Sequence, residues 1–206
     1  ENAKFVCLNV RDSGYLDRHE KSKLRRWSYH DYRDADIDKY VLAAEELVRR
    51  GYYVIRTGVN VLKPLKSPNP QIIDYSNLEI RSDFMDVYLA SKCIFCLAVS
   101  SGFMDAALIF RKPIVDTNSV PLGIVRYLGK KSLTITKHHV HKKYKNRLTI
   151  SEIFSSNVGL SMRSEEFENN DIELEENSSE EIRDLVIEMD DRLKGNWSET
   201  KEDLLL

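Results

Sequence analysis

The stretch Cys93–Val115, CIFCLAVSSGFMDAALIFRKPIV, decides the fold. An apolar run precedes the turn Ser100-Ser101-Gly102, and an amphipathic run and a second apolar run follow it. This pattern predicts a strand, a tight turn, a helix and a further strand. Such a turn aims backbone N–H groups past the strand tip, and the helix N-terminus adds partial positive charge, so the stretch favours a phosphate or another anion as ligand. The alternative is an ordinary β–α turn in which Gly102 supplies an unusual backbone angle.

The same alternation of strands and helices extends toward the N-terminus. Apolar runs at Lys4–Val10 and Tyr52–Arg56 predict two strands, and Gln71–Asp74 a short third one. Apolar residues at helical spacing from Ile37 to Val48 predict a helix, and Ser82 is placed to cap another. Strands separated by helices imply right-handed crossovers and a parallel sheet.

We therefore expect an α/β fold in which helices flank a Rossmann-like parallel sheet. It should occupy residues 1–195 as one domain, followed by a C-terminal tail at 196–206. The residues expected in its core are Cys7, Val54, Ile94 and Leu97. An apolar Ile182–Leu193 pattern closed by Gly195 predicts the last helix.

Polar residues and glycine follow four of the expected strands. They are Arg11 with Asp12, Thr57 with Gly58, Ser100 to Gly102, and Thr117 with Asn118. In parallel sheets ligands bind beyond the carboxyl ends of the strands, so we expect these residues to form one mouth. Arg11 offers a planar donor fork that suits phosphate oxygens, although a salt bridge to an acid is the competing interpretation.

Four residues around this mouth are candidates for sugar binding or catalysis. Asp105 falls in the first turn of its helix, where the dipole favours an acid whatever the function, and it could also accept a hydrogen bond from a sugar or ribose hydroxyl. Asn118 is a candidate for the same role. His30 lies in the long polar loop after the first strand and is a candidate general base, with Asp12 as the other option. A lone loop histidine is more often simply solvated.

Composition narrows the class of protein. The chain has 206 residues, 42% of them hydrophobic, and a net charge of −2, which indicates a soluble globular domain without a field that recruits nucleic acid. The cysteines Cys7, Cys93 and Cys96 are expected to be buried small hydrophobes in a reducing cytosol, since no second pair completes a zinc site. The chain starts at Glu1 rather than Met, so we expect a piece of a longer protein.

The segment Lys137–Arg147, KHHVHKKYKNR, is strongly basic. His138, His139 and His141 suggest a metal, but the surrounding Lys and Arg side chains would repel a cation. We interpret the segment as a solvated surface loop that could also touch an anionic acceptor or a lipid surface. The expected location is the cytoplasm, including the inner face of the cell membrane, and no metal or other cofactor is expected.

Several common motifs are missing from the sequence. It contains neither G-x-x-x-x-G-K-[ST] nor a G-x-G-x-x-G after the first strand, which argues against a P-loop nucleotidase and a dinucleotide oxidoreductase. No serine nucleophile elbow is present either.

Several segments, in order, resemble a family of bacterial glycosyltransferases found in surface-polysaccharide gene clusters. They are VRDSGY at 10–15, YHDYRDADIDKY at 29–40, RRGYYVIRTG at 49–58, RSDFMDVYLASK at 81–92 and SSGFMDAALIFRKPIV at 100–115. The segments ENSSEEIRDLVIEM and RLKGNW resemble the C-terminal helix of the same family. The resemblance implies a GT-B-type architecture, in which two Rossmann-like domains face each other across a cleft. This chain would be the C-terminal donor-binding half, without the N-terminal acceptor domain.

The resemblance also implies roles for individual residues. Arg11 resembles the arginine of the H-x-R motif of fucosyltransferase-like enzymes, which contacts the donor diphosphate, but Asn9 stands where those enzymes carry histidine. The segment that starts at Ser100 resembles the Ser-Gly…Lys-Pro segment that cradles diphosphate in GT-B transferases, so Ser100, Ser101 and Gly102 would face phosphates.

The function expected from these features is glycosyl transfer. The domain would bind a nucleotide-diphosphate sugar, and the sugar would pass to a glycan or another acceptor without help from a metal. Two alternatives stay open: a sugar-nucleotide epimerase on the same scaffold, and a non-catalytic nucleotide-sugar-binding or interaction module.

Overall fold

A six-stranded parallel sheet forms the centre of the molecule in the computed structural model, which describes residues 3–14, 28–124 and 129–200. The strands are β1 (Phe5–Asn9), β2 (Tyr53–Arg56), β3 (Ile72–Ile73), β4 (Cys96–Ala98), β5 (Ile114–Ser119) and β6 (Leu133–Thr136). Their order across the sheet is β3-β2-β1-β4-β5-β6, and every neighbouring pair is parallel. The expected Rossmann-like sheet is confirmed, and the order of strands changes direction between β1 and β4.

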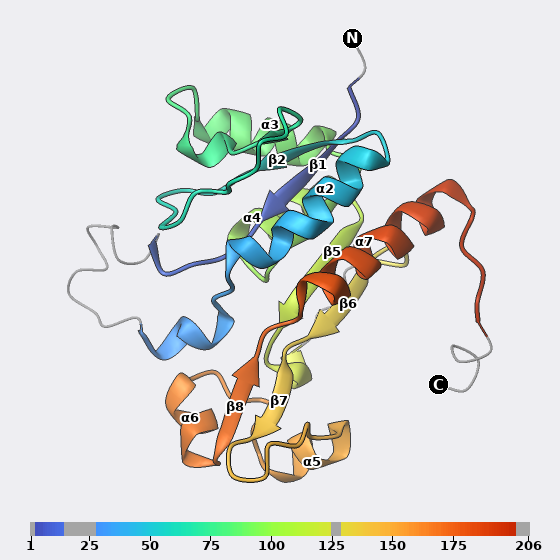
Figure 1. Cartoon of the computed structure of the whole chain (residues 1–206). Coiled ribbons are helices and arrows are strands. Elements are labelled where there is room, and N and C mark those ends of the chain that lie inside the picture. The colour runs from blue at the N-terminus through green and yellow to red at the C-terminus, as the bar shows by residue number, and fades with distance from the viewer. Residues whose placement is uncertain (1–2, 15–27, 125–128, 201–206) are drawn as a thin grey trace.

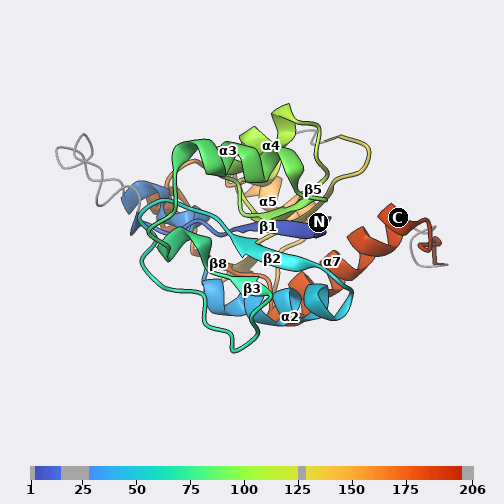
Figure 2. The same ribbon diagram turned by 90° about the horizontal axis from the view of Figure 1, so that it is seen from above.

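Helices cover both faces of this sheet (Figures 1 and 2). On one face lie α2 (Val41–Arg49) and the long C-terminal α7 (Ser179–Lys194), and on the other α3 (Asp83–Lys92) and α4 (Gly102–Ile109). Short 3-10 turns, η2 to η5, occupy Ser28–Arg33, Ile37–Tyr40, Tyr75–Asn77 and Leu122–Ile124. The Ser82 hydroxyl accepts the Met85 N–H and so caps α3, and Gly195 ends α7 in the left-handed conformation.

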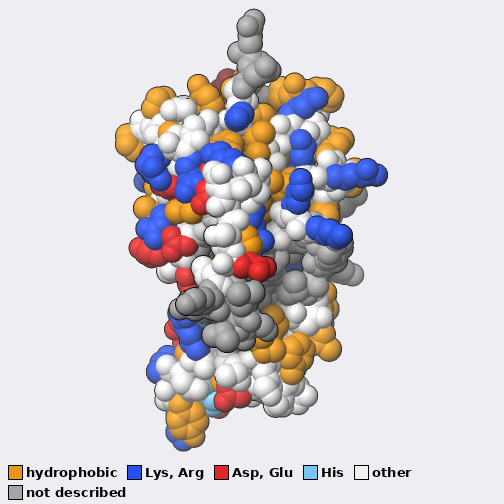
Figure 3. All heavy atoms as spheres, turned by 90° about the vertical axis from the view of Figure 1, so that its right-hand side faces the viewer, with side chains coloured by type: hydrophobic (Ala, Val, Ile, Leu, Met, Phe, Trp, Pro, Cys, Tyr) orange, Lys and Arg blue, Asp and Glu red, His pale blue; other side chains and the backbone are white. Residues whose placement is uncertain are grey.

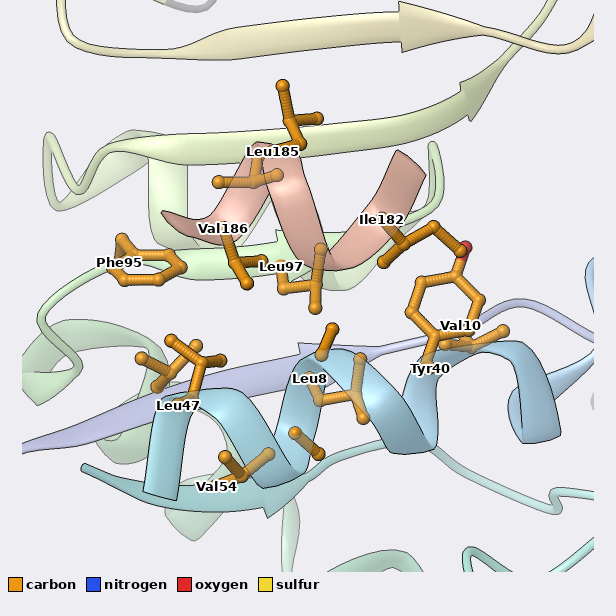
Figure 4. Packing of buried hydrophobic residues seen from close by; sticks show 14 of the residues in the cluster. Leu8, Val10, Tyr40, Leu47, Val54, Phe95, Leu97, Ile182, Leu185 and Val186 are labelled. Carbon is orange, nitrogen blue, oxygen red and sulfur yellow. The ribbon is translucent and has the colours of Figure 1, made fainter. Parts of the chain in front are cut away.

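Two apolar clusters hold the helices to the sheet. In the first, Leu8 and Leu97 of the strands meet Leu47 of α2 and Val186 of α7 (Figure 4). The second cluster, which includes Met104 of α4, lies on the opposite face. The alternation of inward positions along each strand explains why neighbouring residues enter different clusters.

The expected core is confirmed for three of its four members. Cys7, Val54 and Leu97 are fully buried, whereas Ile94 is only partly buried. The reason is that Cys93 serves as the C-cap of α3, so Ile94 lies in the link between that helix and β4.

Beyond β6 the chain forms a small antiparallel pair of strands. These are β7 (His138–His141) and β8 (Ile172–Glu175), and they are accompanied by α5 (Ile150–Ser155) and α6 (Ser164–Asn169). A third apolar cluster, which includes Ile153 and Phe167, lies among these elements.

The prediction of a solvated basic loop at Lys137–Arg147 is wrong for its first half. Lys137 is 5% exposed and His139 is 2% exposed, because β7 pairs with β8 and turns His139 toward the third cluster. The Lys137 ammonium donates to the Asp34 carbonyl oxygen at 2.6 Å. Only the second half of the segment remains a surface turn.

The segment after α7 packs back on that helix through Trp197. Beyond α7, the Trp197 ring lies under the Arg192 guanidinium, 3.4 Å from its carbon to the ring centre, and residues 196–200 have no regular structure. The rest of the expected tail, 201–206, lies outside the described residues, as do Glu1 and most of the polar loop after β1. Among the helices that are described, none combines the length and apolar composition needed to cross a bilayer.

Candidate functional site

A cavity of about 600 Å³ opens where the order of strands reverses, at the carboxyl ends of β1 and β4. Open α/β sheets bind their ligands at this position. The cavity is lined by seven residues that the sequence placed at or around the mouth: Arg11, Asp12, His30, Gly58, Ser100, Ser101 and Gly102. The structure therefore brings together four segments that lie far apart in the chain.

Asn9 ties these segments to one another. Ser101 is the N-cap residue of α4, but its side chain makes no capping bond to that helix. The Ser101 hydroxyl donates instead to the Asn9 Oδ1 atom at 2.6 Å, and the Asn9 amide donates to the Thr57 carbonyl oxygen at 3.1 Å. Because the Ser101 oxygen is directed to Asn9, it does not cap the first N–H groups of α4, and these groups can bind an anion.

Gly102 sits in open space at the start of α4. A Cβ atom built on it would meet no other heavy atom within 4 Å, and its φ angle is outside the left-handed region. Neither the backbone nor the packing requires glycine here, so the alternative explanation of Gly102 as a residue with an unusual angle is wrong. Its missing side chain leaves the helix N-terminus open to the cavity that Gly102 lines.

Arg11 is already engaged inside the protein. Its guanidinium pairs with the Asp34 carboxylate and donates to the His30 carbonyl oxygen at 3.1 Å, and 11% of its side chain is exposed. Burial raises the pKa of Asp34 to about 6, while the charge of Arg11 opposes the rise. The salt-bridge interpretation is thus correct, yet Arg11 also lines the cavity, and an anion bound there would compete with Asp34 for it.

Two further arginines line the cavity that sequence reasoning had not singled out, Arg33 and Arg81. Arg81 is paired with Asp83 at 2.9 Å and Asp86 at 2.6 Å. The buried Arg33 Nε atom has no hydrogen-bond partner among the described residues, and burial lowers the pKa of this side chain. Arg33 therefore lines the cavity with an Nε–H group that is available to donate to a ligand oxygen.

Both arginines stand inside segments already quoted for other reasons, YHDYRD and RSDFMD. The sequence contained no periodic or spacing signal that separates them from ordinary surface arginines. Only the path of the chain beside the cavity distinguishes them.

His30 suits the role of a base. Burial lowers its pKa below the ordinary value of 6.5, and the positive charges of Arg33 and Arg11 lower it further. The imidazole is therefore neutral at pH 7 and able to accept a proton.

Asp12 is held by the backbone. Its two carboxylate oxygens accept hydrogen bonds from the Gly14 N–H at 3.0 Å and the Leu62 N–H at 2.9 Å, and the buried Arg56 guanidinium lies 4.0 Å away. A carboxylate with these contacts fixes the loops that it joins, which leaves His30 as the better placed candidate base.

Asp105 and Asn118 do not reach the cavity. Asp105 lies in the first turn of α4, as expected, but is not among the lining residues. Asn118 is 1% exposed, and its amide donates to the Tyr40 hydroxyl at 2.9 Å and accepts the Asn177 N–H at 2.7 Å. The expectation that Asn118 stands at the mouth is wrong because β5 continues to Ser119 and keeps Asn118 inside the sheet.

No group of three His, Cys, Asp or Glu side chains in the described ranges is arranged to hold a metal ion. The three cysteines are buried and free. Comparisons with protein-family models, with curated proteins and with solved structures each found no match. The fold and the geometry of the cavity are therefore the physical basis for a functional argument.

Proposed function

We propose that this protein binds a nucleotide-diphosphate sugar in the cavity between β1 and β4 and transfers the sugar to a glycan or another acceptor. The observation that carries the proposal is the N-terminus of α4, which lies at that cavity. Ser101 does not cap this helix because its hydroxyl bonds to Asn9. The resemblance of the segments around Arg11 and Ser100 to glycosyltransferases points to the same ligand.

The diphosphate would lie against the start of α4. N–H groups there and the helix dipole favour negative charge, and Gly102 lets the oxygens approach the backbone. Arg11 and Arg33 line the same cavity and would contribute charge-assisted hydrogen bonds. These fixed donors stabilise the charge that builds up on the departing nucleoside diphosphate.

His30 would serve as the general base. The acceptor hydroxyl loses its proton to the neutral imidazole while its oxygen forms a bond to the anomeric carbon. The bond from that carbon to the phosphate oxygen breaks, and its electron pair leaves with the nucleoside diphosphate. The residues of this chain that take part are the base, the arginines and the start of α4.

The experiment that tests this function is a binding screen followed by calorimetry. Thermal shift with UDP-, GDP-, ADP- and CMP-sugars identifies the nucleotide, and titration of Arg11→Ala measures the phosphate contact. We expect a loss of about tenfold or more, because a charge-assisted hydrogen bond contributes about 1.5–3 kcal/mol. The matched control is Arg183→Gln on α7, whose guanidinium pairs with the neighbouring Asp184 and does not line the cavity.

Two results would contradict the proposal in different ways. Failure of every nucleotide sugar to shift the melting temperature would favour a non-catalytic interaction module. Conversion of a nucleotide sugar with no acceptor present would favour the epimerase instead.

A further inference from the structure

A second cavity lies at the opposite edge of the sheet. It has a volume of about 340 Å³, and its lining includes Leu108 and Pro113 on one side and Gly129 and Ser132 on the other. These residues precede β5 and β6, so the cavity is at the amino ends of those strands. It is separate from the cavity at the carboxyl ends of β1 and β4.

Four cationic side chains line this second cavity: Arg111, Lys112, Lys130 and Lys131. No acidic residue is among its lining residues, and within the described ranges none of the four takes part in an ion pair. Figure 3 shows the side of the molecule on which β6 lies. On the right of its upper half Lys and Arg side chains gather without Asp or Glu among them. Like charges gathered around one cavity repel each other and raise its affinity for an anion.

The end of α4 explains only part of this cluster. Cations at a helix C-terminus complement the dipole, which accounts for Arg111 and Lys112. Lys130 and Lys131 come from a separate segment and have no such role. Arg111 also adopts a left-handed conformation, with φ of 56°, at a position after a helix where glycine is usual. A large cationic side chain is thus kept at a position that the backbone alone would assign to glycine.

We propose that this cavity is a second anion site, which binds the phosphate group of a polyanionic ligand. Its arginine supplies a planar donor fork, and its three lysines supply mobile point charges. Phosphates of this kind come from two sources, a free phosphorylated compound or the headgroups of an anionic membrane. Ile109, 77% exposed, and Phe110, 43% exposed, precede Arg111 in the chain. Exposed apolar side chains beside cations favour the membrane as the source, because they can enter the interface below the headgroups.

The test uses the full chain and two pairs of substitutions with equal change of charge. Lys130→Gln/Lys131→Gln alters the second cavity. Lys4→Gln/Lys66→Gln is the matched control, because both residues are exposed, precede β1 and β3, and line neither cavity. Inorganic pyrophosphate is titrated calorimetrically into each pair in an Arg11→Ala background, so that binding at the first cavity is weakened throughout. Vesicles of phosphatidylcholine with and without phosphatidylglycerol form the second arm.

We expect the Lys130/Lys131 pair to lose about tenfold in affinity and the Lys4/Lys66 pair to keep it. Loss in the pyrophosphate arm identifies a free phosphorylated ligand. Loss confined to phosphatidylglycerol vesicles identifies the membrane as the source. Equal binding by both pairs in both arms would overturn the proposal, whether or not the first cavity binds nucleotide sugars. Circular dichroism of each variant confirms that a loss of binding does not come from unfolding.

Discussion

The Ser101 hydroxyl donates to the Asn9 Oδ1 atom at 2.6 Å, which joins the end of β1 to the turn that starts α4. A serine at an N-cap usually accepts an N–H of its own helix. Here it does not, so the helix start remains available to a ligand. The bond between these two residues is therefore the structural feature on which the proposed phosphate binding depends.

Replacing Asn9 with Ala should weaken nucleotide binding by freeing Ser101 to cap α4 itself. It should also lower the free energy of unfolding by about 1–3 kcal/mol, because the buried Asn9 amide bonds to Thr57. Urea denaturation and calorimetric titration measure the two effects. The control is Thr57→Val, which removes the Oγ1 atom that bonds to Asn9 and Leu8 but keeps the Thr57 carbonyl and the bond from Ser101 to Asn9; it should cost stability without reducing affinity. An equal loss of affinity in both variants would show that the effect is only structural.

Gly102→Ala separates ligand binding from packing. The added methyl group meets nothing in the protein and the backbone angle is not left-handed, so stability should be unchanged or rise by up to about 1 kcal/mol. Affinity for the nucleotide sugar should fall, because the methyl group enters the space in front of the helix N-terminus. Thermal melting and titration of the same sample check both expectations. A variant that binds as tightly as the wild type would mean that no ligand approaches this position.

His30→Gln should slow sugar transfer strongly and leave donor binding nearly intact. Loss of a general base lowers kcat by roughly 10²–10⁴, since glutamine cannot accept the proton. The measurement is sugar transfer at saturating donor, accompanied by donor affinity from calorimetry. In the wild type, the rate should fall as the pH drops below the lowered pKa of His30. An unchanged rate of sugar transfer in His30→Gln would show that another group is the general base.

Asp34 should make ligand binding depend on pH. Its pKa is about 6 in the folded protein against 3.8 for an ordinary aspartate, so the folded state binds the proton more tightly. Between those two values stability from this group rises as the pH falls, and it is lost as the pH rises through about 6. Protonation also releases Arg11, which should then bind phosphate more tightly.

Asp34→Asn tests this competition. The substitution should raise the affinity for a nucleotide sugar at pH 7 and flatten its change between about pH 7 and 5. Protonation of His30 at low pH would also add positive charge at the cavity. The calorimetric measurement is therefore repeated with His30→Gln added to the wild type and to Asp34→Asn. An unchanged pH profile in Asp34→Asn would show that Arg11 does not need release.

The local elements followed from the sequence alone. Apolar periodicity, the Ser82 cap and the Gly195 stop are properties of short segments, and the helices and strands that they predicted are present. The alternation of these elements predicted the parallel sheet, and the polar residues after β1 and β4 predicted the mouth. Each of these inferences depends on neighbours within a few positions of the chain.

Tertiary structure decided which of those residues act together. The bond from Ser101 to Asn9 spans 92 positions, and Arg33 reaches the cavity only because its loop folds beside β1. Asn118 is buried because β5 extends past the point where its apolar run ends. Pairing over such separations depends on strand register and on the path of loops, which the local pattern of side chains does not encode.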